Sequence, residues 1–232
     1  MTKEKYTYTL NKTFLKIISS FIIMILIIVS VKGQTNKKIN YQINFGTCIS
    51  LPYKYKIEIP KYDMAFNSNP SFGYFTEILV GFNFNNQFSI FTGVNYLQSN
   101  LNINNNFFDL KIKGKRKSSS LVFPLVAKYQ FSKKLPVIVG FGTYFSKILT
   151  IEEKGTSLVN NMISSHDLDI KERYKSYDFG ISGQVDFDLR ISDKVMCVLF
   201  SKFNYGLINV MEFSSWDKWR NYNMLLGFGI KI

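Results

Sequence analysis

Strict alternation of apolar and polar side chains is the feature that most constrains the fold of this chain. From Tyr41 to Phe45 every second side chain is large and apolar, and the residues between them are Gln42 and Asn44. Successive side chains of a β-strand point to opposite faces, so the pattern predicts a strand with one apolar and one polar face. The most regular segments are residues 39–51, 177–190 and 221–232.

Five further strands alternate less regularly and bring the expected total to eight. Their ranges are about residues 72–84, 87–97, 120–131, 136–149 and 195–205. Short links at residues 85–86, 132–135 and 191–194 alternate with long connections at residues 52–71, 98–119, 150–175 and 206–220. This alternation is typical of outer-membrane barrels, with short periplasmic turns and long external loops. The sequence therefore predicts an all-β fold: an eight-stranded antiparallel up-and-down transmembrane β-barrel.

The direction in which the polar face points separates a membrane barrel from a soluble one. A soluble barrel is apolar inside, whereas a membrane barrel is apolar outside. Charges in the middle of the predicted strands favour the membrane barrel, in which they face the lumen. They are Glu77, Lys128, Asp186 and Lys202. Glycines on the same face, such as Gly140 and Gly227, would make room in a narrow lumen for larger polar neighbours.

Aromatic residues on the apolar face fall at two heights. Near the long connections lie Tyr74, Tyr96, Phe145, Tyr177 and Tyr222, and near the short links lie Phe84, Phe88, Tyr129, Phe131, Phe187 and Phe228. Two aromatic girdles are expected where a barrel crosses the two membrane interfaces. We therefore expect a multi-pass barrel in the outer membrane.

The first 33 residues have the order of an export signal. Lysines precede an apolar run over residues 17–31, and Gly33 is the small residue expected at a cleavage site. The alternative is an uncleaved anchor, but the run is shorter than the ~20 apolar residues of a spanning helix. We expect a cleaved signal peptide at residues 1–33 and a barrel domain at 34–232. Residues 1–33 hold five lysines and one glutamate, so their removal lowers the net charge from +13 to +9. Export argues against intracellular nucleic acid as the partner of that charge.

Several short motifs resemble the PorT-like outer-membrane β-barrel family of the Bacteroidetes. They lie at Leu121–Tyr129, Leu135–Tyr144, Asp178–Gly180, Ile191–Lys194, Phe203–Asn209 and Gly227–Ile232. The resemblance covers roughly residues 35–232 and implies a small porin-like barrel. It also implies that the barrel-assembly machinery reads the terminal strand. One namesake of the family is linked to protein secretion across the outer membrane and to gliding, and the resemblance carries no catalytic residues.

Groups that could support catalysis or metal binding are few. His166 lies between Ser165 and Asp167, but neighbours in one loop rarely converge with the geometry of a triad. Carboxylates from Glu152 to Glu172 could favour calcium, although their spacing matches no calcium-loop motif. We therefore expect a protein that is not an enzyme and that holds no cofactor or metal.

A basic cluster occupies the second long connection. Its members are Lys111, Lys113, Lys115, Arg116 and Lys117. Such a cluster could contact the phosphates of lipopolysaccharide or an acidic partner. The alternative is a solvated strand extension that keeps the connection soluble, and the sequence leaves both interpretations open.

Two tryptophans and two cysteines were considered for structural roles. Trp216 and Trp219 in the last connection are predicted to anchor at the outer interface, with contact to a partner as the alternative. Cys48 and Cys197 fall on the first and seventh predicted strands, which are not neighbours in an eight-stranded barrel. We therefore expect no disulfide between them.

The sequence favours a non-enzymatic scaffold or surface-binding element of the outer membrane whose long external loops form the working surface. The expected partners are outer-membrane lipid, lipopolysaccharide, the barrel-assembly machinery and other envelope proteins. One alternative is a narrow porin-like channel, and another is an accessory component of secretion or gliding.

Overall fold

In the computed structural model all described residues belong to the unit Ile39–Ile232. Within it the described residues are 39–51, 55–59, 62–107, 110–132, 136–159, 162–192, 195–210 and 220–232. The predicted signal peptide at residues 1–33 lies outside the described residues. Among those that are described, no helix has the length and apolar character needed to cross a membrane.

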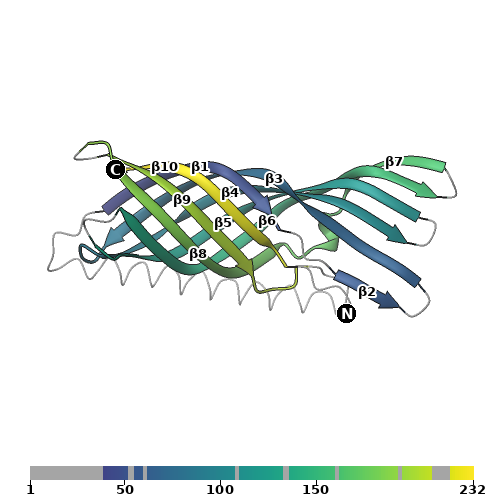
Figure 1. Ribbon diagram of the computed structural model, residues 1–232, viewed down its shortest axis with the longest axis horizontal. Helices are drawn as coiled ribbons and strands as arrows, with labels where there is room; N and C mark the ends of the chain where they lie inside the picture. Colours follow the sequence, from purple (N-terminus) through teal and green to yellow (C-terminus); the bar gives the residue numbers. More distant parts are fainter. Residues whose placement is uncertain are drawn as a thin grey trace, which may run out of the picture. The chain divides into compact units, whose positions relative to one another are not determined.

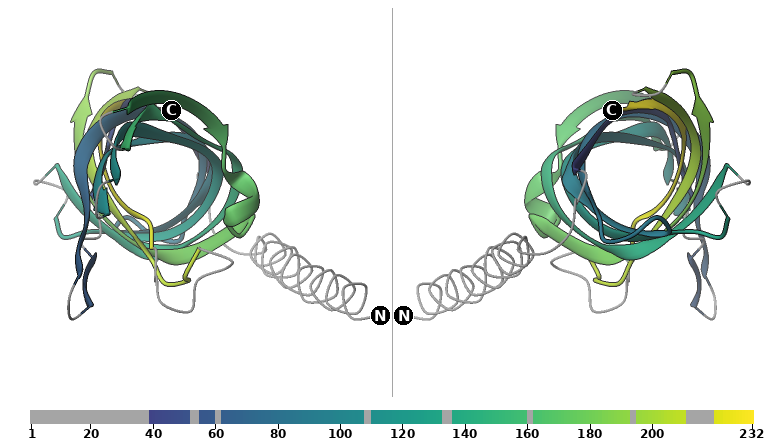
Figure 2. Two further views of the ribbon diagram at one scale, coloured as in Figure 1. Left: turned by 90° about the vertical axis from the view of Figure 1, so that its right-hand side faces the viewer. Right: turned by 90° about the vertical axis from the view of Figure 1, so that its left-hand side faces the viewer.

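The described residues form ten strands, and eight of them close a barrel (Figure 1). The eight are β1 (Ile39–Ser50), β3 (Tyr62–Asn83), β4 (Phe88–Phe107), β5 (Leu110–Gln130), β6 (Val137–Val159), β8 (Tyr177–Arg190), β9 (Met196–Gly206) and β10 (Tyr222–Lys231). Each pairs antiparallel with its neighbours, and β1 closes the ring because it pairs with both β3 and β10. Figure 2 shows the closed ring from both ends. The predicted fold class is confirmed.

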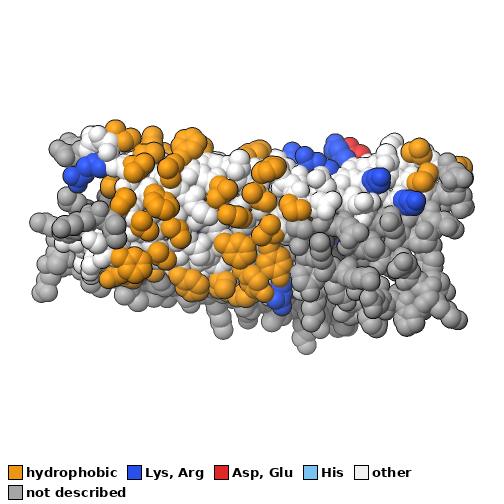
Figure 3. All heavy atoms as spheres, in the orientation of Figure 1, with side chains coloured by type: hydrophobic (Ala, Val, Ile, Leu, Met, Phe, Trp, Pro, Cys, Tyr) orange, Lys and Arg blue, Asp and Glu red, His pale blue; other side chains and the backbone are white. Residues whose placement is uncertain are grey.

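The two faces of each strand have opposite character. In β1 the side chains of Tyr41 and Ile43 are 56% and 44% exposed, whereas those of Gln42 and Asn44 are 1% and 0% exposed. The apolar face therefore points outward and the polar face points into the lumen, as in a membrane barrel. Hydrophobic side chains gather over the barrel wall in Figure 3. The soluble alternative, with an apolar interior, does not fit this arrangement.

Aromatic side chains form contacts at both ends of the apolar wall. Near the long connections the ring pairs are Tyr74–Tyr96, Phe145–Tyr177 and Tyr205–Tyr222, with centroids 6.1, 5.5 and 4.9 Å apart. Near the short links they are Phe84–Phe88 and Tyr129–Phe131, with centroids 5.7 and 5.2 Å apart. The two predicted aromatic heights are thus present, and they bracket the wall that would contact lipid.

Glycines on the inner face make room for aromatic rings. Gly46 of β1 pairs with Gly227 of β10, and a Cβ atom on Gly46 would lie 2.8 Å from the ring of Phe75. A Cβ atom on Gly180 would lie 2.5 Å from the ring of Tyr144. Inner-face glycines do create space, but the neighbours of these two are aromatic rings rather than the larger polar side chains that were expected.

The long connections contain far more strand than predicted. Strands β3 to β6 continue past the barrel wall to Tyr62, Phe107, Leu110 and Val159, where loops were expected. Two further strands pair with these extensions: β2 (Tyr55–Ile59) with β3, and β7 (Met162–Asp169) with β6. The prediction of loops in these segments was wrong. A two-stranded ribbon with water on both faces does not require alternating apolar and polar side chains, so the pattern that marks a strand in the membrane is weak here.

Candidate functional site

Buried ion pairs cross the lumen of the barrel. Lys202 of β9 lies 2.5 Å from Glu77 of β3, and Lys128 of β5 lies 2.7 Å from Asp186 of β8. All four side chains are at most 2% exposed. The four mid-strand charges expected in the lumen are therefore there, and the structure pairs each acid with a lysine. A third pair joins Lys231 to Asp188.

Amide side chains connect these pairs to one another. Asn44 donates from Nδ2 to Glu77 at 2.8 Å, and Gln42 donates from Nε2 to Asn44 at 2.9 Å. The ammonium of Lys128 reaches Gln42 Oε1 at 3.4 Å and lies 4.2 Å from the ring centre of Phe91. Buried charges are tolerated only when they are paired and hydrogen-bonded, and this network meets both conditions.

An apolar cluster fills another part of the lumen. It consists of Cys48, Phe75, Leu97, Val122, Tyr144, Val198, Phe200 and Leu225. The rings of Phe75 and Phe200 meet edge to face, with centroids 5.7 Å apart. The sequence pattern did not predict this cluster, because its members interrupt an otherwise polar face. Together with the ion pairs it fills the narrow interior, as expected for eight strands.

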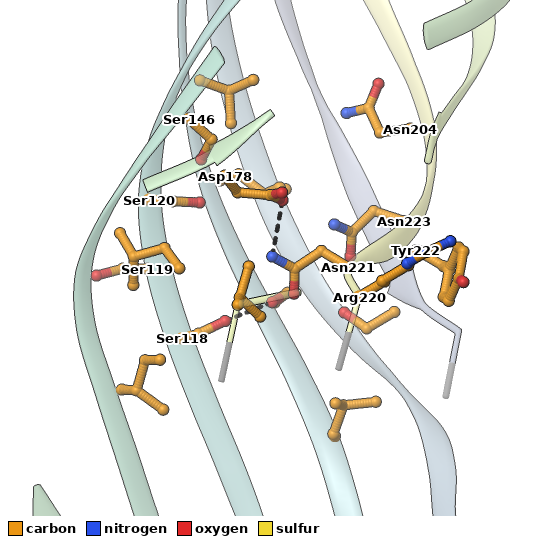
Figure 4. Close-up of a pocket in the computed structure, with 18 of the residues that line it drawn as sticks. Ser118, Ser119, Ser120, Ser146, Asp178, Asn204, Arg220, Asn221, Tyr222 and Asn223 are labelled. Carbon is orange, nitrogen blue, oxygen red and sulfur yellow. Dashed lines mark hydrogen bonds between the residues drawn. The ribbon is translucent and has the colours of Figure 1, made fainter. Parts of the chain in front are cut away.

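A pocket opens at the end of the barrel that carries the strand extensions (Figure 4). Its volume is about 50 Å³, which is room for a few water molecules or one small group. The lining combines serine hydroxyls, such as those of Ser118 and Ser146, with the carboxylate of Asp178 and the amide of Asn204. Sequence reasoning did not single out this site, because its residues come from strands that meet only when the barrel closes.

Asp178 is the buried acid of this pocket. Its Oδ2 atom accepts hydrogen bonds from Asn221 Nδ2 at 2.9 Å and from the Tyr144 hydroxyl at 3.3 Å. The side chains of Asp178 and Asn221 face each other in Figure 4. The other oxygen, Oδ1, is buried and has no hydrogen-bond partner among the described residues.

The predicted basic cluster divides between two faces of β5. Lys111, Lys113, Lys115 and Lys117 are exposed and occupy alternate positions of the strand, whereas Arg116 points to the opposite face. The prediction that all five residues lie in a loop is wrong, because β5 already begins at Leu110. Since side chains alternate along a strand, Arg116 cannot share a surface with the four lysines.

Arg116 is held on the inner face of the extensions. Its Nε and Nη2 atoms donate to Glu153 Oε2 at 3.1 and 2.7 Å, and its guanidinium lies 5.5 Å from the ring centre of Tyr174. His166 lies 3.8 Å from Glu153 through Nε2. Arg116 is therefore part of an internal contact between extensions and not of an exposed binding surface.

The four lysines form what we call the lysine ladder: Lys111, Lys113, Lys115 and Lys117. Across the strand pairing, Lys115 lies opposite Lys154, whose ammonium contacts Asp167 at 2.7 Å. That hydrogen bond raises the pKa of Lys154. No described carboxylate forms an ion pair with a member of the ladder. Basic side chains over the extended strands are visible in Figure 3.

The tryptophans, the carboxylates considered for calcium and the two cysteines do not come together in a binding site among the described residues. Trp216 and Trp219 lie outside the described residues. The carboxylates considered for calcium are engaged singly, Glu153 with Arg116 and Asp167 with Lys154, and the described residues contain no group of three metal-binding side chains. Cys48 and Cys197 are free and lie on β1 and β9, between which β10 intervenes.

Comparisons with known proteins agree with this geometry. Residues 32–212 match the family model described as outer membrane protein beta-barrel domain. Comparison with curated proteins gives no match.

Several solved structures are similar to this chain. OprG from Pseudomonas aeruginosa has a TM-score of 0.49 and 10% identity, over 84% of this chain and 97% of that one. Neisserial surface protein A has a TM-score of 0.41 and 11% identity, over 85% and 99%. Ail, the attachment invasion locus protein of Yersinia pestis, has a TM-score of 0.41 and 12% identity, over 84% and 99%.

Proposed function

Because the chain belongs to the outer membrane protein beta-barrel domain family, we propose that it is a non-enzymatic surface-binding protein of the outer membrane. The closed barrel is its membrane anchor, and the extensions of β3 to β6 form its working surface outside the cell. The lumen supports an anchoring role, since ion pairs and aromatic rings fill it. We therefore assign binding to the outer face of the extensions.

The observation that carries the proposal is the lysine ladder. Its exposed side chains occupy alternate positions on one face of β5, and no described acid forms an ion pair with them, although Glu152 lies opposite Lys117 in the pairing of β5 with β6. Neighbouring Cα atoms of the ladder are two strand residues apart, about 6.8 Å. A row of positive charges at this spacing favours a repeating anionic ligand, such as the phosphates of lipopolysaccharide.

Neutralising the ladder tests this proposal. Purified barrel in which Lys113, Lys115 and Lys117 are all changed to glutamine should bind lipopolysaccharide at least about tenfold more weakly, because each charge near an anionic surface contributes about 1 kcal/mol. The natural protein should also lose affinity as salt rises. The matched control changes Lys171, Arg173 and Lys175 to glutamine, which removes the same charge from another part of the connections. Equal loss in both variants, or none in either, would contradict the proposal.

A second proposal rests on the resemblance to the PorT-like family. The motifs at Leu121–Tyr129 and Gly227–Ile232 support an accessory role in protein secretion or gliding, alongside other envelope proteins. On this account, deleting the gene should reduce the amount of secreted protein, and restoring it should reverse the defect. A normal secretome in the deletion strain would oppose this role and leave the lipopolysaccharide proposal untouched.

A further inference from the structure

Arg220 lies beside two tyrosines at the outer end of the barrel wall. Its Nη1 atom donates to the hydroxyl of Tyr205 at 3.4 Å, and its guanidinium also interacts with Tyr222. Figure 4 shows the side chains of Arg220 and Tyr222 next to each other. Tyr205 and Tyr222 are directly opposite in the pairing of β9 with β10, and their rings meet edge to face with centroids 4.9 Å apart. We call these three residues the Arg220 cluster.

The positive charge of the Arg220 cluster is not neutralised by any described acid. The buried lysines Lys128 and Lys202 and the arginine Arg116 each form an ion pair with a carboxylate, whereas no described carboxylate forms one with Arg220. A guanidinium carries five N–H donors, and the tyrosine hydroxyls engage only some of them. All three residues of the cluster are partly exposed, so the cluster is open from outside the barrel.

The Arg220 cluster stands above an apolar strip of the wall. Tyr205 and Tyr222 belong to the aromatic contacts near the long connections, where a barrel meets the outer membrane interface. Phe203 and Met224 lie opposite each other two residues further into the wall, and Leu226 follows on β10. Side chains alternate along a strand, so these residues share the outer face with the tyrosines. Phe203 and Leu226 are 42% and 38% exposed, which leaves the strip open to lipid.

We propose that the Arg220 cluster binds the phosphate headgroup of a lipid in the outer leaflet, whose acyl chains lie along this apolar strip. Arginine suits phosphate because its planar fork donates parallel hydrogen bonds to two oxygens. Tyr205 accepts from Arg220 and retains its own hydroxyl hydrogen for a third oxygen. Soluble phosphate offers the same oxygens but no chains for the strip, so we assign the ligand as a lipid. The site lies apart from the lysine ladder and does not depend on the proposed surface function.

Native mass spectrometry of the purified protein in a neutral detergent tests the site, with dioleoyl phosphatidic acid as the probe. We expect saturable binding of one lipid per barrel. Arg220→Gln removes the charge and should weaken binding at least about tenfold, the value of one charge-assisted hydrogen bond. Arg220→Lys keeps the charge without the planar fork and should weaken it by a smaller factor. Tyr205→Phe removes one donor and keeps the ring, so it should also have the smaller effect.

Controls separate this site from general attraction of anions. Dioleoylglycerol has the same chains without the phosphate and should not bind, and inorganic phosphate at equal concentration should not displace the lipid. Lys147→Gln removes one positive charge at the same level of the wall, where Lys147 lies opposite Tyr177, and should leave affinity unchanged. The variant with Lys113, Lys115 and Lys117 changed to glutamine should also bind normally, which keeps this test independent of the lysine ladder.

Four results would overturn the proposal. The first is the absence of saturable binding to the natural protein. The second is equal affinity in Arg220→Gln, and the third is an equal loss in Lys147→Gln. The fourth is displacement of the lipid by inorganic phosphate at equal concentration, which would show that the acyl chains contribute nothing. A heat-dependent gel shift confirms that each variant is folded before its affinity is compared.

Discussion

Lys202 and Glu77 form an ion pair across the lumen, between strands that are not neighbours in the barrel. Their nitrogen and oxygen atoms lie 2.5 Å apart, and both side chains are almost completely buried. The strand order places β10 and β1 between β9 and β3. The pair therefore ties opposite parts of the wall together, which backbone pairing alone cannot do.

Removing one partner of this pair should destabilise the barrel strongly. Lys202→Met leaves Glu77 as an uncompensated buried charge, and we expect a loss of about 3–5 kcal/mol in the free energy of unfolding. The double variant Glu77→Gln/Lys202→Met should lose less than the sum of the single variants. Urea unfolding in lipid vesicles measures all three, and simple additivity would show that the two residues are not coupled.

The inner and outer faces could be predicted from the sequence, but the extensions could not. The alternation correctly predicted that Tyr41 points outward and Gln42 points into the lumen. It could do so because the lipid-facing surface is apolar and the lumen is polar. Beyond the membrane an apolar outer face is no longer required. The start of β5, where four lysines alternate with Ile112, Gly114 and Arg116, was therefore predicted as part of a connection rather than as a strand. The separation of Arg116 from the lysines was present in the sequence, since it alone holds an even-numbered position in the cluster.

The pocket could not be predicted from the sequence, because its residues come together only when the barrel closes. Asp178 and Asn221 are 43 residues apart in the chain, and their hydrogen bond forms only across the outer mouth. Period-two alternation places Asp178 on the inner face, yet it does not say which cation, if any, lies opposite. Whether an inner charge is paired depends on strand order and register, which alternation does not specify.

The apolar wall should be sensitive to charge only where lipid contacts it. Ile78 and Ile163 are both strongly exposed, at 54% and 77%, but Ile78 lies on the barrel wall and Ile163 on the β7 extension. Ile78→Arg should cost about 2–4 kcal/mol, the value for a cation near the bilayer midplane. Ile163→Arg should be nearly neutral. Unfolding in lipid vesicles compares the two, and equal costs would argue against a membrane-embedded wall.

The filled lumen should conduct poorly. In planar bilayers the natural protein is expected to give no regular single-channel steps, because side chains occupy the interior of an eight-stranded barrel. The variant Lys128→Ala/Asp186→Ala removes one ion pair without changing net charge and should increase ion leakage. Clear steps from the natural protein would favour the narrow channel over the surface-binding account.

The two cysteines provide a probe of the inner face. Cys48 is fully buried in the lumen and should resist a polar maleimide as long as the barrel is folded. In the Cys197→Ser variant, labelling should therefore appear only after heating in detergent. Mass spectrometry before and after heating measures it, and rapid labelling of the folded variant would place Cys48 on an accessible surface.

Gel mobility of the protein from the outer-membrane fraction tests the central claim, a closed membrane barrel, most directly. Samples are run in detergent with and without boiling. A closed barrel keeps its compact shape until it is heated, so the account predicts a shift in mobility for protein recovered with the outer membrane. An unshifted band from protein that is soluble in the periplasm would contradict it.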